Sequence, residues 1–416
     1  MSRRGRERES TMLAERYKKM LSQESMIRQI FMYGKKRGAE IGYENVFDYS
    51  LGNPSVPCPP AFTAAMQKLL AEKEPVALHG YCPNQGDPDF RRAVAESCAR
   101  RFGLAYEAKH IFPTTGAAGA LAHALRAVVT PGQKVLTFAP YFSEYGPYVA
   151  GLDAVLEIVP ADTETFQPNF DRLEQMLDET VAAVLINTPN NPSGVAYSCA
   201  SMQRLGDILR AKSAAFGHEI FLISDEPYRE IRYAGAEHPY PAAYYDNTLT
   251  CYSFSKSMSL PGERIGYVAV NPKAEGADIL VDMMAQISRG TGHNCPPSLI
   301  QQAVAQCIDC TSDLSVYETN MNLLYNKLVE LGFTVVKPGG TFYIFPKCLE
   351  SDSMAFCEKA KEFDLLLVPG DGFGVPGYFR MAYCIDTEKV QRSLAALEKL
   401  PCLTTMQKAS SCFISI

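Results

Sequence analysis

Short apolar runs of strand length recur through the middle of the chain, and amphipathic stretches separate several of them. The stretches 170–178 and 200–216 show the spacing of apolar residues that is expected of helices. Strand-length runs that are apolar throughout are typical of strands buried on both faces of a sheet. Their alternation with helices predicts an α/β fold with a largely parallel, helix-covered sheet. The predicted strands are residues 134–138, 154–159, 181–187, 220–224, 249–254 and 265–270.

The pattern changes after about residue 310. A predicted helix at 317–331 precedes four short apolar runs, and only some of these are separated by helices, which indicates a smaller α+β domain. The first 60 residues hold a helical arm and an extended Pro-rich segment. We expect the arm and the first part of the small domain in residues 1–60, a large domain in 61–310 and the C-terminal small domain in 311–416. The four runs are residues 333–336, 341–345, 365–368 and 378–382.

Length and composition narrow the class of protein. A chain of 416 residues agrees with two domains, and 47% apolar with 21% charged residues is typical of a globular protein. The net charge of −6 gives no sign of the basic surface that nucleic-acid binding requires. The apolar runs are far shorter than the roughly 20 residues of a membrane-spanning helix. The Arg-rich start, residues 3–9, also contains two glutamates and no apolar stretch follows it, which favours a solvated or subunit-clasping arm over a secretory signal.

Thirteen cysteines, an odd number scattered along the chain, are typical of reduced thiols in a cytoplasmic protein. One group, His293, Cys295, Cys307 and Cys310, allows a zinc site as an alternative. Its single C-x-x-C lacks a second pair, and Cys307 and Cys310 are assigned to a predicted helix around 299–308. We therefore expect ordinary buried thiols and no metal.

A lysine among small hydroxyl residues stands just after the predicted strand 249–254. Lys256 closes the sequence Ser253-Phe-Ser-Lys, and Arg264 follows eight residues later. The amine of lysine has a pKa of about 10.4, which burial or nearby cations must lower before the amine can act as a nucleophile. Ser253 and Arg264 offer the hydrogen-bond donors and positive charge that suit a phosphate. On its own the motif also fits a surface lysine.

A carboxylate follows the predicted strand 220–224. A buried Asp225 would require a partner, because an unpaired buried charge is very costly. The protonated nitrogen of a pyridine ring would be such a partner and would keep the ring an electron sink. Tyr228, three residues further on, would reach the phenolic oxygen of the same ring. The alternative is that Asp225 caps the turn that follows it.

Three further segments follow predicted strands or open a helix. Gly116 and the two alanines after it begin an apolar helix, and a helix N-terminus with small residues can bind an anion or simply pack closely. Asn191 lies in the loop 188–194, whose Asn, Pro and Gly content turn chemistry alone would explain. Phe142 offers an aromatic face for stacking, although aromatic residues also form plain core.

An arginine interrupts the apolar run 378–382. A buried guanidinium at Arg380 would require an anion, and its planar fork suits a carboxylate. An interdomain salt bridge is the equally open alternative.

In their order along the chain, from Leu51-Gly-Asn-Pro54 to Arg380, these segments resemble the fold-type I pyridoxal 5′-phosphate (PLP) dependent aminotransferases of class I/II, the aspartate aminotransferase-like superfamily. The resemblance implies a large domain with a mostly parallel seven-stranded sheet and a smaller α+β domain. It also implies transfer of an amino group between an L-amino acid, aspartate-like or broad, and a 2-oxo acid such as 2-oxoglutarate.

The resemblance assigns roles around the cofactor. Lys256 matches the lysine that carries PLP as a Schiff base and later moves the substrate proton. Asp225 matches the partner of the pyridine nitrogen, Tyr228 and Asn191 match the groups on the phenolic oxygen, and Phe142 matches the stacking ring, in a chain that has no tryptophan. The residues that match the phosphate cup are Ser253, Arg264, Gly116, Ala117 and Ala118; the two alanines lack the hydroxyl that many relatives have, and Thr115 is a candidate to compensate.

It also assigns roles at the substrate. Arg380 matches the arginine that binds the α-carboxylate, with Gly52 and Asn191 beside the substrate. Tyr81 matches a tyrosine that reaches the phosphate of the neighbouring subunit's cofactor, which implies a homodimer with shared active sites. Arg289 lies near the arginine that binds a second carboxylate in aspartate-specific relatives, with a spacing to Pro296-Pro297 that is one residue longer than expected.

Two other functions remain open at this stage. The same residues would support β-elimination, as in carbon–sulfur lyases, because the electronic properties of the cofactor are common to both reactions. A ligand-sensing regulator without catalysis would carry a DNA-binding module in front, and the roughly 45 residues before the predicted core show no helix-turn-helix pattern.

Overall fold

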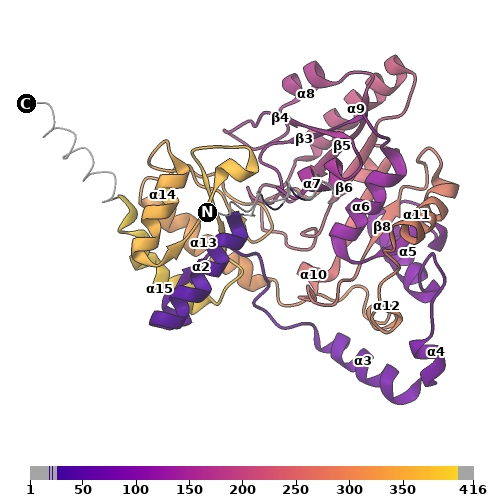
Figure 1. Cartoon of the computed structure of the whole chain (residues 1–416), viewed down its shortest axis with the longest axis horizontal. Coiled ribbons are helices and arrows are strands. Elements are labelled where there is room, and N and C mark those ends of the chain that lie inside the picture. The colour runs from indigo at the N-terminus through magenta and orange to yellow at the C-terminus, as the bar shows by residue number, and fades with distance from the viewer. Residues whose placement is uncertain (1–17, 19–20, 22–25, 402–416) are drawn as a thin grey trace, which may run out of the picture.

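The computed structural model describes residues 18, 21 and 26–401, so the Arg-rich start and the last dozen residues lie outside the described residues. A seven-stranded sheet forms its centre, in the order β2-β8-β7-β6-β5-β3-β4. Every neighbouring pair is parallel except those that β8 makes, so the predicted, mostly parallel sheet is confirmed (Figure 1). The strands are β2 (Ile111–Thr114), β3 (Lys134–Phe138), β4 (Val155–Val159), β5 (Val181–Asn187), β6 (Phe221–Asp225), β7 (Thr248–Ser253) and β8 (Gly266–Val270).

Helices cover both faces of this sheet, because the side chains of each strand alternate between two apolar layers. On β5, Leu185 packs into the layer formed with α6 (Gly116–Val128) and α11 (Ala277–Thr291). Its neighbour Val184 packs into the opposite layer, with α8 (Phe170–Met176) and α9 (Cys199–Phe216). Every residue of β5 is buried, which explains why the strand reads as one continuous apolar run.

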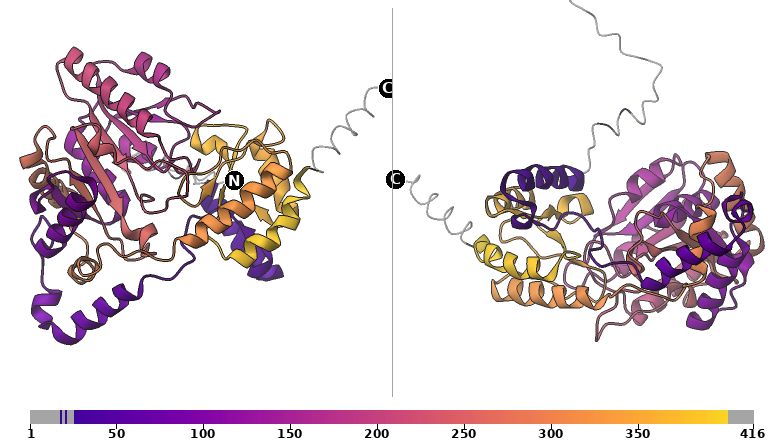
Figure 2. Two further views of the ribbon diagram at one scale, coloured as in Figure 1. Left: turned by 180° about the vertical axis from the view of Figure 1, so that it is seen from behind. Right: turned by 90° about the horizontal axis from the view of Figure 1, so that it is seen from below.

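A second set of elements packs beside the large sheet. The strands β11 (Val368–Pro369), β12 (Phe379–Ala382) and β9 (Tyr343–Ile344) form an antiparallel sheet in that order. A separate short pair joins β1 (Phe47–Asp48) to β10 (Leu365–Leu366), so residues near both ends of the chain meet here. Figure 2 shows these strands among the surrounding helices α2 (Met26–Ile41), α13 (Ser315–Glu330), α14 (Ser353–Ala360) and α15 (Thr387–Leu397).

Three expectations from the sequence are wrong in detail. Residues 333–336 form no strand. Phe333 is buried in the core of the smaller set of elements, where it packs against other side chains without belonging to a strand. The strand β2 was not expected, since Pro113 interrupts its apolar run; the strand lies at the edge of the sheet, where proline is tolerated. The predicted helix at 299–308 ends early, as α12 (Ser298–Ala305), so Cys307 lies in the turn behind it.

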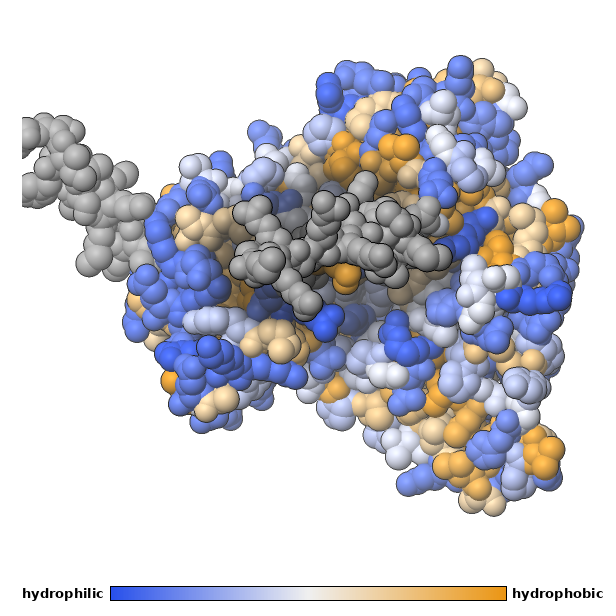
Figure 3. All heavy atoms as spheres, viewed as in Figure 1, coloured by the Kyte–Doolittle hydropathy of each residue, from blue (hydrophilic) through white to orange (hydrophobic). Residues whose placement is uncertain are grey.

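One part of the chain projects from the body. The helices α3 (Pro60–Glu72) and α4 (Pro75–His79) stand away from the sheet before α5 (Pro88–Phe102) returns to it (Figure 1). Figure 3 shows apolar side chains on this projection, and Leu70 and Val76 are 57% and 78% exposed. Tyr81, just after α4, is fully exposed. Within the described residues, none of the helices has the length and apolar character needed to cross a membrane.

Candidate active site

The carboxyl ends of the central strands open into one cleft of about 600 Å³, which we call the Lys256 cleft. Asp225 ends β6, and Lys256 lies in the short helix α10 (Phe254–Ser257) directly after β7. Ligands in open α/β sheets bind at this end of the strands. The cleft brings together most of the residues singled out in the sequence, which are Gly52, Ala117, Ala118, Phe142, Asn191, Asp225, Tyr228, Ser253, Lys256, Arg264 and Arg380.

The amine of Lys256 lies inside this cleft. Its Nζ donates to the carbonyl oxygen of Gly52 at 2.6 Å and lies 5.5 Å from the centre of the Phe342 ring. Burial disfavours the charged ammonium and lowers the pKa of Lys256 to about 8. The neutral, nucleophilic amine is therefore well populated at mildly alkaline pH.

The carboxylate of Asp225 is buried and only half satisfied. Its Oδ2 accepts a hydrogen bond from the Tyr145 hydroxyl at 2.6 Å, whereas its Oδ1 has no partner among the described residues. The amide of Asn187 donates to the Asp225 carbonyl at 2.8 Å and fixes the end of β6. Burial raises the pKa of Asp225 to about 7, against the lowering effect of the Tyr145 hydrogen bond. A cationic N–H donor at Oδ1 would relieve that cost.

The N-terminus of α6 and Arg264 form a cradle for an anion. Gly116 opens α6 with φ of +76°, and a Cβ at this position would lie 2.7 Å from Nη2 of Arg264. Arg264 donates to the Thr115 carbonyl at 3.2 Å, so its guanidinium lies against the first turn of the helix. Across the cradle, Ser253 Oγ accepts from the Ser255 amide at 3.1 Å and caps α10. Helix N-termini beside a guanidinium are suited to phosphate.

Arg380 lies on β12 and is 2% exposed. Its Nη1 donates to Asn191 Oδ1 at 3.0 Å and its Nη2 to the Ser50 carbonyl at 2.5 Å, while its Nε has no partner among the described residues. The guanidinium carbon lies 4.7 Å from the centre of the Tyr343 ring and 4.9 Å from that of Phe373. Among the described residues no carboxylate forms a salt bridge with Arg380, and its hydrogen-bond partners are the amide oxygen of Asn191 and the carbonyl oxygen of Ser50.

The sequence did not point to several side chains of the cleft. Tyr145 lies on α7 (Tyr145–Ala150), 80 positions before the aspartate that it contacts, and no local pattern announces that contact. The hydroxyls of Tyr343 and Tyr228 lie 3.2 Å apart. Ser255 was visible only as one of the serines before Lys256. The arm helix α2 also reaches the cleft, through Ile27, Arg28 and Phe31.

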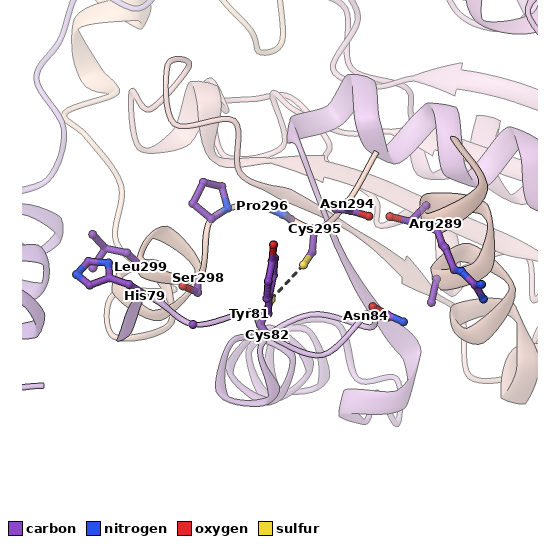
Figure 4. A pocket seen from close by; sticks show the side chains of 14 residues that line it. His79, Tyr81, Cys82, Asn84, Arg289, Asn294, Cys295, Pro296, Ser298 and Leu299 are labelled. Carbon is purple, nitrogen blue, oxygen red and sulfur yellow. Dashed lines mark hydrogen bonds between the residues drawn. The ribbon is translucent and has the colours of Figure 1, made fainter. Parts of the chain in front are cut away.

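Tyr81 and Arg289 do not reach the Lys256 cleft of their own chain. Both line a separate hollow of about 740 Å³, the Tyr81 hollow, between the loop after α4 and the end of α11. Figure 4 shows Tyr81 in this hollow, close to the contact between the sulfur atoms of Cys82 and Cys295, which is drawn as a dashed line. Two of the residues considered for a zinc site have other contacts. The sulfur of Cys295 faces that of Cys82, and the ring of His293 contacts the Thr115 hydroxyl. The described residues contain no group of three or more metal-ligating side chains.

Comparisons with known proteins decide the family. Residues 44–397 match the family described as aminotransferase class I and II. The chain belongs to this family. An aspartate aminotransferase from Geobacillus stearothermophilus is 30% identical over 77% of this chain and 83% of its own length. An aromatic-amino-acid aminotransferase from Thermococcus litoralis is 29% identical over 86% of this chain and 92% of its own length.

A solved structure of an amino transferase from Eubacterium rectale superposes with a TM-score of 0.91 at 45% identity, covering 94% of this chain and 98% of that one. The protein is thus a fold-type I, PLP-dependent aminotransferase, as the motifs indicated. The residues of the Lys256 cleft fit the cofactor of this family. Oδ1 of Asp225 is buried without a partner among the described residues, and Gly116 leaves open the space beside Arg264 that a Cβ would fill.

Proposed function

We propose that this aminotransferase holds PLP on Lys256 and transfers amino groups between an L-amino acid and a 2-oxo acid such as 2-oxoglutarate. The observation that carries the proposal is the convergence of Lys256, Asp225 and Arg380 in one cleft. All three are ionisable groups for which burial disfavours the charge, and no described residue forms a salt bridge with any of them. A zwitterionic amino acid and a pyridine cofactor would supply the missing countercharges.

Several side chains would hold the cofactor in place. Oδ1 of Asp225 is free to accept from the pyridine N–H, and the Arg264 cradle suits the phosphate. Asn191 accepts from Arg380 through its Oδ1, which leaves its amide N–H groups to donate to the phenolic oxygen beside Tyr228. Bound PLP supplies an electron sink that weakens the Cα–H bond of the amino acid.

Lys256 and Arg380 would act on the amino acid itself. The fork of Arg380 binds the α-carboxylate, stacked against the ring of Tyr343, and so fixes which Cα substituent faces the lysine. The lysine amine, with its pKa lowered to about 8, removes the Cα proton and returns one in the second half of the reaction. An aspartate-like side chain would extend to Arg289 of a neighbouring subunit, and apolar side chains would instead pack on the residues of α2.

The proposed assembly is a cytoplasmic homodimer with shared sites. Tyr81 is fully exposed in the single chain and lies outside the Lys256 cleft, which supports a role for it at the phosphate of a second subunit. The exposed Leu70 and Val76 on the projecting helices would be covered in the same interface. Apolar patches of this kind are typical of subunit contacts.

A single-turnover absorbance scan of the PLP-loaded protein against a panel of amino acids tests the proposal. Conversion of the cofactor band into that of the aminated cofactor, with one oxo acid released per site, is the expected result. Persistence of the original band, with pyruvate and ammonia formed from cysteine-like substrates, would instead identify a β-eliminating lyase. A correctly folded protein that takes up no PLP would contradict the proposal outright.

A further inference from the structure

Two cysteines face each other in the Tyr81 hollow. The sulfur atoms of Cys82 and Cys295 lie 3.0 Å apart, although the residues are 213 positions apart in the sequence. Both are half-buried and lie in loops, Cys82 between α4 and α5 and Cys295 between α11 and α12. A disulfide bond measures about 2.05 Å, so the sulfurs need to move by about 1 Å to form one. Loop residues can make that shift without breaking a helix or strand.

A buried glutamine holds the two loops in this position. Gln301 Nε2 donates to the Pro296 carbonyl at 2.7 Å and also contacts Cys82 Sγ at 3.6 Å. Its Oε1 accepts from the amide of Asp87 at 2.8 Å. One side chain of α12 thus fixes the backbone on both sides of the thiol pair. The two loops that carry the sulfurs are therefore both held by the same side chain.

The pair is chemically asymmetric. Either sulfur can donate the hydrogen bond between the two thiols; with Cys295 as the donor, this bond lowers the pKa of Cys82 to about 6. The same contact raises the pKa of Cys295. Cys82 is therefore the thiolate of the pair at neutral pH, and the thiolate is the nucleophile in thiol–disulfide exchange.

We propose that Cys82 and Cys295 form a reversible redox site, in which a small-molecule disulfide such as oxidised glutathione converts the pair into an intramolecular disulfide. The step does not depend on the aminotransferase reaction, so it can be tested independently of the proposed substrates.

The exchange is balanced in two steps. The Cys82 thiolate attacks one sulfur of oxidised glutathione, the S–S bond of the reagent breaks, and one glutathione thiolate leaves. The Cys295 thiol then loses its proton to solvent and attacks the Cys82 sulfur of the mixed disulfide, which expels the second glutathione. The protein loses two electrons and the Cys295 proton, and the two glutathione thiolates that leave take up protons from solvent, so that one oxidised glutathione becomes two reduced molecules.

Oxidation at this position would reach the cofactor site through His293. That residue is two positions before Cys295, and its Nε2 lies 3.3 Å from Thr115 Oγ1, at the start of the Arg264 cradle. The disulfide would tie the loop of His293 to the loop of Tyr81. Both loops then lose freedom together, and one of them adjoins the predicted phosphate site. We therefore expect oxidation to change the rate of PLP release. This expectation, unlike the disulfide itself, rests on the proposed function.

The full-length, PLP-loaded protein is equilibrated with mixtures of reduced and oxidised glutathione, and its free thiols are then blocked and mapped by mass spectrometry. We expect the wild-type chain to lose two titratable thiols together, in a peptide pair that joins Cys82 to Cys295. The variant Cys295→Ser should retain one glutathione on Cys82, because no second thiol is present to expel it. The variant Cys58→Ser removes a half-buried thiol elsewhere and should form the disulfide as the wild type does.

Three outcomes would overturn the proposal. The first is that both thiols stay free under an excess of oxidised glutathione in the wild-type protein, a measurement that needs no variant. The second is a disulfide that joins either cysteine to a different partner. The third is that glutathione, in wild-type protein quenched with acid early in the reaction, is found on Cys295 and not on Cys82, which would reverse the proposed nucleophile.

Discussion

The Lys256 cleft and the Tyr81 hollow both collect reactive side chains, but different physical causes perturb them. In the cleft, strand ends carry ionisable groups into the interior, and burial is the largest of the effects that move the pKa of Lys256 down to about 8 and that of Asp225 up to about 7. In the hollow, two loops bring half-exposed thiols together, and one hydrogen bond lowers the pKa of Cys82 to about 6. A pKa shift caused by burial is relieved when a ligand supplies the opposite charge. A pKa shift caused by a single neighbouring residue disappears when that residue is replaced.

The largest effect is expected at the lysine of the cleft. Lys256→Ala should reduce transamination by about 10⁴-fold or more, because it removes both the attachment point of the cofactor and the proton-transferring base. The fold should persist, since the substitution deletes a charge that burial disfavours. Steady-state rates and circular dichroism check both points. Lys212→Ala, on the outer helix α9, serves as the control and should keep full activity; near-normal turnover of Lys256→Ala would refute the assignment.

The next effect concerns stability against pH in the cofactor-free protein. The pKa of Asp225 is raised from its unfolded value of about 3.9 to about 7, so between these values the folded state binds the extra proton. Stability should therefore fall as pH rises from about 4 to about 7. Asp225→Asn lacks this titration and should be more stable than the wild type above pH 7, by about 4 kcal/mol at most. Denaturant unfolding at a series of pH values measures the difference.

A neighbouring carboxylate provides the control for that prediction. Glu226 is also buried, but its Oε2 lies 3.3 Å from Nη1 of Arg229. Glu226→Gln leaves Arg229 without its buried partner and should destabilise the protein while PLP affinity stays unchanged. Asp225→Asn should show the reverse, with weaker PLP binding in a stable fold. Equal losses of PLP affinity in both variants would remove the special role of Asp225.

The two arginines test the cleft against the hollow directly. Arg380→Lys should lower kcat/KM by about 10²-fold for every amino acid, since a lysine cannot reproduce the bidentate, ring-stacked contact with the α-carboxylate. Arg289→Ala should lower kcat/KM only for dicarboxylic substrates. The two roles are distinguished by measuring kcat/KM for aspartate and for a neutral amino acid in both variants. Equal losses across all substrates in Arg289→Ala would contradict its proposed role.

The smallest effect is expected at the exposed tyrosine of the hollow. Tyr81→Phe removes one hydroxyl and should speed PLP release by about threefold to tenfold, the cost of one hydrogen bond. The rate is measured by dilution of the loaded protein into an apo-enzyme that captures free PLP. An unchanged rate of PLP release, in a protein shown to be dimeric, would mean that the Tyr81 hydroxyl does not bind the phosphate.

Patterns local in sequence predicted the strands that carry the site. The run 181–187 coincides with β5 because both faces of that strand are buried, and its first six positions are apolar. The same reasoning failed at Phe333, which is apolar because it packs into the small core without entering a ladder. Burial alone therefore does not distinguish a strand from a packed loop.

The contacts that complete the site join distant parts of the chain. Tyr145 reaches Asp225, and Arg380 reaches the Ser50 carbonyl across 330 positions. The thiol pair spans a similar distance, and no periodicity or spacing signals it. Family resemblance supplied the residues that relatives share, but the side chains that tune the pKa values of this particular chain became visible only in three dimensions.

The pairing of β1 with β10 has a consequence for the order in which the chain matures on the ribosome. Residues 47–48 leave the exit tunnel more than 300 positions ahead of their partners, residues 365–366. The seven-stranded sheet is complete once β8 has emerged, so it can assemble during translation. Val46 and Tyr49, which are fully buried in the finished protein, lack their β10 neighbours until residues 365–366 have emerged. Until then this early segment keeps apolar side chains available for a chaperone to bind.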